Sequence, residues 1–107
     1  MMPPQPSVLN IAFDRLALAD ACQRHGVRQL DLFGSAVTKA FKPGLSDIDL
    51  LADIELSQGQ SYLDAFQGLH AELEAIFGQR VDLIANSTMQ NPFFRAAVDR
   101  QRQRLFP

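Results

Sequence analysis

The chain has 107 residues, a formal net charge of −2 and one cysteine, Cys22. This length suits one domain, and the balance of charges offers no broad basic surface, so direct binding of nucleic acid is not expected. A lone cysteine excludes an internal disulfide and a cysteine-based zinc cluster. No apolar run approaches the roughly 18 residues of a membrane span. The first residues also lack a signal peptide's basic and apolar regions, so we predict a cytoplasmic protein without membrane association.

Prolines, glycines and capping residues divide the chain into a flexible lead over residues 1–9 and a single domain over 10–107. Gly26 and Gly78 are typical helix stops, and Asn91 before Pro92 is typical of a helix start. The predicted elements are helices at 10–25, 35–40, 62–77 and 92–105 and strands at 27–33, 47–54 and 80–85. The apolar positions of the first helix are Ile11, Phe13, Leu16, Leu18, Ala21 and Cys22. This order predicts an α/β (α+β) fold, with a small mixed sheet of three or more strands flanked by helices.

Two acidic residues, Asp47 and Asp49, stand two apart in an apolar run. Because side chains alternate along a strand, both carboxylates leave the same face. Two like charges held together on a strand are costly unless a cation lies between them, and oxygen ligands of this kind suit Mg²⁺. The alternative is the solvated face of a half-exposed strand.

A Gly-Ser pair, Gly34 and Ser35, ends the first predicted strand and opens a short helix. Glycine lets a phosphate approach the main chain, and the serine hydroxyl lies beside free N–H groups at the positive end of the helix dipole. Lys39 lies where a triphosphate would pass. An ordinary turn and an ordinary loop cation are the alternatives for these residues.

Gly34-Ser35, a spacer of eleven residues and Asp47-x-Asp49 resemble the signature of DNA-polymerase-beta-like nucleotidyltransferases. The match is to the minimal nucleotidyltransferases that act as antitoxins beside HEPN-domain toxins. The family spacer is usually one residue shorter, and a longer loop absorbs that difference cheaply. Asp82, on the third predicted strand, corresponds to the family's third carboxylate, although a single acid at that position is otherwise read as a surface residue.

The resemblance implies a polymerase-beta-like palm fold and transfer of AMP from ATP to a hydroxyl group. Asp47, Asp49 and Asp82 would be the catalytic residues and the ligands of two Mg²⁺ ions, and Gly34, Ser35 and Lys39 would bind the nucleotide. The acceptor implied is a tyrosine of a HEPN-type toxin ribonuclease, which the modification would silence. Whether the chain forms a homo- or hetero-oligomer stays open.

Two other functions stay open at this point. The protein could be a non-catalytic antitoxin that neutralises its partner by occlusion, or a nucleotidyltransferase acting on a small molecule, as aminoglycoside-modifying relatives do. Three mutually repelling carboxylates argue against a site kept only for its shape. The absence of a second substrate domain argues against a small-molecule acceptor.

The last predicted helix is basic and also carries several apolar residues. Its arginines are taken as a solvated face or a site for an acidic partner, and its apolar residues as a docking surface. The arginines are Arg95, Arg100, Arg102 and Arg104, and the apolar residues are Phe93, Phe94, Val98, Leu105 and Phe106.

Overall fold

The computed structural model describes residues 13–34, 47–56, 59–86 and 91–107. Several predictions lie outside these residues: the flexible lead, the short helix at 35–40, and the nucleotide contacts of Ser35 and Lys39. Within the described residues, no helix combines the length and the apolar character needed to cross a membrane.

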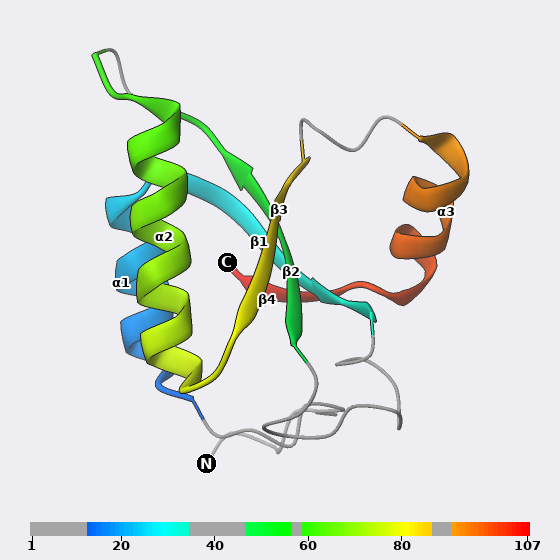
Figure 1. The fold of residues 1–107 in the computed structure, drawn as a ribbon, viewed down its shortest axis with the longest axis horizontal. Helices are drawn as coiled ribbons and strands as arrows, with labels where there is room; N and C mark the ends of the chain where they lie inside the picture. Colours follow the sequence, from blue (N-terminus) through cyan, green and yellow to red (C-terminus); the bar gives the residue numbers. More distant parts are fainter. Residues whose placement is uncertain (1–12, 35–46, 57–58, 87–90) are drawn as a thin grey trace.

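The described part of the chain forms a mixed sheet with helices on both faces (Figure 1). The strands lie in the order β3-β2-β1-β4; β1 is antiparallel to both its neighbours, and β3 is parallel to β2. The predicted α/β (α+β) fold with a small mixed sheet is therefore confirmed. The elements are α1 Arg15–Arg24, β1 Val27–Phe33, β2 Ile48–Ile54, α2 Tyr62–Phe77, β3 Val81–Ala85, α3 Pro92–Gln101 and β4 Gln103–Phe106.

Alternation along the strands separates two cores, one on each face of the sheet. On one face, Ile48 and Leu50 of β2 are fully buried with Leu69 and Leu73 of α2 and with residues of α1. On the other face, Leu51 packs with Phe33, Val98 and Ile84, under α3. Figure 1 shows α1 and α2 beside one side of the sheet and α3 beside the other.

The helix boundaries follow the capping residues. Ser61 accepts a hydrogen bond from the N–H of Asp64, and Asn91 accepts two from the first turn of α3. Gly78 ends α2 in the left-handed region, as predicted. The start of the first helix was predicted wrongly at Asn10, because Asp14 caps it through the N–H groups of its own first turn.

Two predicted members of the apolar side of the first helix lie elsewhere. Leu16 is 83% exposed, so the prediction that it belongs to the buried face was wrong. Phe13 precedes the helix and packs its ring 4.9 Å from that of Phe77. The buried positions of α1 are Leu18, Ala21 and Cys22.

The end of the chain differs most from the prediction. The last helix stops at Gln101 instead of continuing to Leu105, and Gln103–Phe106 forms β4 on the open edge of β1. Leu105 and Phe106 pack against the core beneath α1 and α2, so they are not part of a docking helix. Phe93 remains 86% exposed, while Val98 is buried.

A buried carboxylate explains why the last residues leave the helix. Asp31 in β1 is 2% exposed and is the one charged residue buried among those described. Arg104 donates to it at 3.1 Å, Arg102 lies 3.7 Å away, and the Gln29 amide donates at 2.7 Å. A buried charge is tolerated only with such partners. The extended backbone that starts at the cap residue Arg102 and continues into β4 brings both arginines to Asp31, and a continued helix would turn them to different sides.

We expect a chain ending at Gln101 to lose roughly 3–5 kcal/mol of unfolding free energy, because Asp31 would be buried without its arginines. Thermal and urea unfolding followed by circular dichroism measure this loss. The matched control removes only Pro107, which leaves β4 in place.

The same unfolding measurement with Asp31→Asn separates the contribution of the Asp31 charge to stability from that of the β4 backbone. In the full chain the substitution should destabilise the protein, and in the shortened chain it should cost less, because no arginine is left to pair with it. Equal costs in both chains would contradict the role given to the buried carboxylate.

Candidate active site

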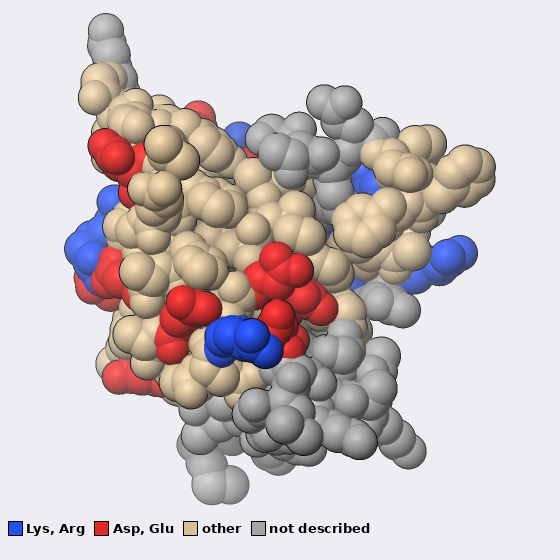
Figure 2. All heavy atoms as spheres, viewed as in Figure 1, with Lys and Arg blue, Asp and Glu red and all other residues tan. Residues whose placement is uncertain are grey.

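The strand register brings acidic residues from distant parts of the chain into one row. Phe33 of β1 pairs with Asp49 of β2, and Asp49 pairs with Asp82 of β3. Asp47 precedes β2 and leaves on the same side as Asp49, because the two stand two residues apart. We call Asp47, Asp49 and Asp82 the acidic row. Figure 2 shows a group of acidic side chains near the middle of one face of the molecule.

Asp49 is the most perturbed carboxyl group of the row. Its pKa is raised from 3.8 to about 6, chiefly by burial and then by the charges of Asp82 and Asp47 and a hydrogen bond to Asp82. A pKa raised in this way shows that burial and neighbouring negative charge both oppose the ionisation of Asp49. This is the electrostatic setting of a cation site.

Gly34 makes room for the carboxylate of Asp49. Its φ is +70°, and a Cβ at this position would overlap Asp49 Oδ2. Any other residue would push the carboxylate away from the main chain and would also strain the backbone. The Gly34–Asp49 contact therefore joins the end of β1 to the acidic row.

Asp47 is engaged differently from the other two acids. Its carboxylate lies 3.2 Å from Arg80, whose side chain is largely exposed. Within the described residues, no three His, Cys, Asp or Glu side chains are arranged closely enough to hold a metal ion. The donor set of Asp49 and Asp82 still suits a hard divalent cation, and Asp47 would join it by exchanging Arg80 for the cation.

Both histidines connect structural elements. His70 donates from Nε2 to the carbonyl of Val81 at 2.7 Å, which links α2 to β3. His25 bonds Glu72 of α2 from the end of α1. Neither lies in the acidic row.

A second polar cluster on the same face was missed by the sequence analysis. It consists of Gln29, Asp31, Asp53, Asn86, Arg95 and Arg102, which line a cavity of about 170 Å³ together with Leu51. The available signal was a charged residue inside each of two apolar strands. Asp31 and Asp53 both interrupt such runs on the face that also carries Asp49.

The fold is that of a nucleotidyltransferase, and comparison with known proteins agrees. The chain matches the nucleotidyltransferase domain family over residues 15–105 and belongs to it. The predicted enzyme class, nucleotidyltransferase, is therefore confirmed.

A curated relative is the protein adenylyltransferase MntA of Thermococcus cleftensis (strain DSM 27260 / KACC 17922 / CL1). It is 39% identical over 69 residues, which are 64% of this chain and 66% of the relative. The match thus spans just under two thirds of that relative's length.

Solved structures share the fold. One described as a minimal nucleotidyltransferase has a TM-score of 0.67 and 31% identity, covering 83% of this chain and 86% of its own. A toxin–antitoxin complex with AMP-PNP has a TM-score of 0.63 and 18% identity over 87% of this chain and 73% of its own. The predicted resemblance to minimal nucleotidyltransferases is confirmed.

We expect Asp49→Asn to stabilise the metal-free protein at pH 7 by about 1 kcal/mol, a value that allows for the partial exposure of this carboxyl. Between about pH 4 and pH 6 the folded state keeps a proton that the unfolded state has lost. Unfolding free energy contributed by this group is therefore present below pH 4 and lost as the pH rises through 6. Urea unfolding across this range should show that decline in the native protein and not in the variant.

The control for this measurement is Glu55→Gln, which removes an exposed acid just after the same strand. It should leave the pH dependence between 4 and 6 as it is. A variant Asp49→Asn with the same slope as the native protein would show that Asp49 is not the group responsible.

Gly34→Ala and Gly78→Ala form a matched pair, because both glycines have positive φ angles, of +70° and +69°. Each substitution should cost roughly 1–2 kcal/mol of backbone strain. A Cβ at Gly78 meets nothing within 4 Å, whereas one at Gly34 meets Asp49. Calorimetric titration with Mn²⁺ should therefore show weaker binding only for Gly34→Ala, and equal affinities in both variants would contradict the contact's role.

Proposed function

We propose that this protein is a metal-dependent adenylyltransferase that transfers AMP from ATP to a hydroxyl group of a partner protein. The observation that carries the proposal is the acidic row beside Gly34, in a chain 39% identical to a protein adenylyltransferase over 69 residues. Cytoplasmic location stays a prediction.

The partner we propose is a HEPN-type toxin ribonuclease, modified on a tyrosine, with this chain as its antitoxin. Two structural neighbours support this choice: a toxin–antitoxin complex with AMP-PNP, and a tri-AMPylated Shewanella oneidensis HEPN toxin in complex with an MNT antitoxin. The second has a TM-score of 0.51 and 16% identity, over 87% of this chain and 72% of its own.

The reaction is an in-line displacement at the α-phosphorus of ATP. The acceptor oxygen forms a bond to phosphorus, the bond to the bridging oxygen of pyrophosphate breaks, and the acceptor's proton is released. Two Mg²⁺ ions, when bound, neutralise the charge on the attacking and leaving oxygens. Asp47, Asp49 and Asp82 would hold them, and Asp82 is our candidate for orienting the acceptor hydroxyl.

The residues of the site have different proposed roles. The raised pKa of Asp49 means that the site binds a cation by giving up a proton, so cation affinity should increase with pH. Gly34 leaves the space in which the Asp49 carboxylate lies. Ser35 and Lys39 are proposed to bind the phosphates, as the motif implies.

A second function, neutralisation by occlusion, is favoured by one observation. The ion pair between Asp47 and Arg80 holds one of the three carboxylates away from a shared ligand position. A binding module would need neither the metal nor the nucleotide, so the two functions are separable by experiment.

The test incubates the protein with α-labelled ATP, Mg²⁺ and its proposed partner, a purified HEPN-type toxin. The double variant Asp49→Asn/Asp82→Asn should lower label transfer at least about a hundredfold, the scale for loss of a catalytic electrostatic element. EDTA should abolish transfer by the native protein. Asp20→Asn, which changes an exposed acid of α1, should transfer label normally.

Two results would contradict catalysis. One is equal ATP affinity in EDTA and in Mg²⁺, measured by calorimetry. The other is a double variant that transfers no label yet silences its partner as the native protein does, which would establish occlusion.

A further inference from the structure

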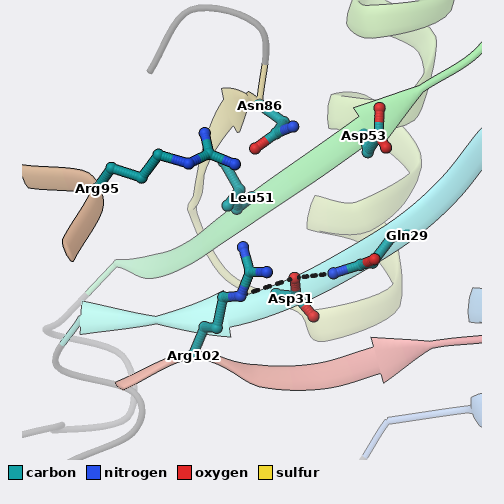
Figure 3. A pocket seen from close by; sticks show the side chains of 7 residues that line it. All are labelled: Gln29, Asp31, Leu51, Asp53, Asn86, Arg95 and Arg102. Carbon is teal, nitrogen blue, oxygen red and sulfur yellow. Dashed lines mark hydrogen bonds and ion pairs between the residues drawn. The ribbon is translucent and has the colours of Figure 1, made fainter. Parts of the chain in front are cut away.

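The polar cavity lies on the same sheet face as the acidic row, two rows further along the strands. Asp31 pairs with Leu51 in the middle row, and Gln29 pairs with Asp53 in the third. Because Ala52 pairs with Ala85, Asn86 continues that third row beyond the end of β3. Figure 3 shows these side chains around the cavity, with Arg95 reaching in from α3.

Three groups around the cavity have polar atoms without a partner among the residues that the structure describes. Asn86 Oδ1 is fully buried and accepts no hydrogen bond. Arg95 and Asp53 form no ion pair with any described residue, although both line the same space. Asp31, by contrast, is satisfied by its arginines and Gln29.

An unpartnered buried acceptor is costly, typically about 1–3 kcal/mol, and is rare in folded proteins. Here it stands beside the Arg95 guanidinium and the Asp53 carboxylate, which pair with no described residue, in a cavity that Leu51 also lines. The cavity therefore offers hydrogen-bond donors, acceptors and one flat apolar contact, which is the combination found in sites for polar heterocycles.

We propose that this cavity receives the nucleobase of the nucleotide, and that Asn86 makes adenine the preferred base. This inference rests on the proposed function, because the nucleotide's phosphates would lie at the acidic row. The Asn86 amide presents one acceptor and one donor in a plane, which complements the amino group of adenine and a neighbouring ring nitrogen. The planar guanidinium of Arg95 is suited to stack on the ring.

Dimensions agree with this assignment. Asp49 and Asp53 are four residues apart on β2, or about 13 Å at the strand rise of 3.3 Å per residue, which is comparable with the length of a nucleoside monophosphate. The cavity of about 170 Å³ equals roughly five or six waters at ~30 Å³ each. It has room for one planar heterocycle and not for a whole nucleotide, so the ribose and phosphates would extend along the face toward the acidic row.

The first test is Asn86→Asp, which replaces the amide by a carboxylate that can only accept hydrogen bonds. Adenine would lose its complementary donor, while guanine offers two neighbouring donors to a carboxylate. Calorimetry in Mg²⁺ should show the ratio of ATP to GTP affinity falling at least about tenfold relative to the native protein, on the scale of one lost bidentate contact.

The second variant, Arg95→Ala, tests the stacking contact. We expect it to weaken ATP and GTP alike by about tenfold, within the range for loss of one stacked side chain. Binding of inorganic tripolyphosphate, which has no base, should be unchanged in both variants. Arg100→Ala is the matched control, because it removes an exposed arginine of the same helix that does not line the cavity.

The proposal is overturned if both cavity variants keep the native ATP-to-GTP ratio and ATP affinity, or if they weaken tripolyphosphate as much as ATP. Native nucleotide binding combined with lost label transfer would also overturn it, because the cavity would then hold part of the acceptor. A native protein that binds neither ATP nor tripolyphosphate in Mg²⁺ would refute the proposed function instead. Circular dichroism and thermal unfolding confirm that each variant compared is folded.

Discussion

Strand β2 has a neighbour on each edge and covered surface on both faces, so each of its side chains must suit one of two environments. Ile48, Leu50 and Ala52 enter the core under α1 and α2, which leaves Asp49, Leu51 and Asp53 on the opposite face. A shift of one residue would place the acids in the core under α1 and α2 and move Ile48 and Leu50 to the polar face. This constraint holds the register, and the register in turn sets the acidic row, the small core under α3 and the polar cavity in successive rows.

The buried carboxylate of Asp31 ties the end of the chain to that same face. Its ion pairs with Arg102 and Arg104 require an extended backbone, so the last helix ends early and β4 completes the sheet. Helix α3, which ends just before β4, packs on the sheet where Val98 meets Phe33, Leu51 and Ile84. Arg95, on that helix, reaches the cavity as a consequence. The buried charge of Asp31 therefore helps to position α3, which carries Arg95 to the polar cavity.

The acidic row is unfavourable for folding and useful for binding. Asp49 keeps its proton to about pH 6 because burial and two neighbouring carboxylates oppose its ionisation. A divalent cation would relieve this repulsion, and the free energy lost in the metal-free fold would be recovered on binding. Gly34 leaves the space beside β1 that the Asp49 carboxylate occupies.

The sequence by itself determined the elements whose signals are local: the glycine stops after α1 and α2, the Asn91 cap, the three strands with apolar alternation, and the identity of the acidic motif. Only the tertiary structure decided features that depend on partners distant in the chain. The pattern of residues 102–106 is compatible with a helix and with a short strand. The segment is extended because the charge of Asp31, 71 positions before Arg102 in the chain, must be balanced by arginine side chains. The cavity was invisible for the same reason, since Gln29, Asp53, Asn86 and Arg95 become neighbours only through strand register and helix packing.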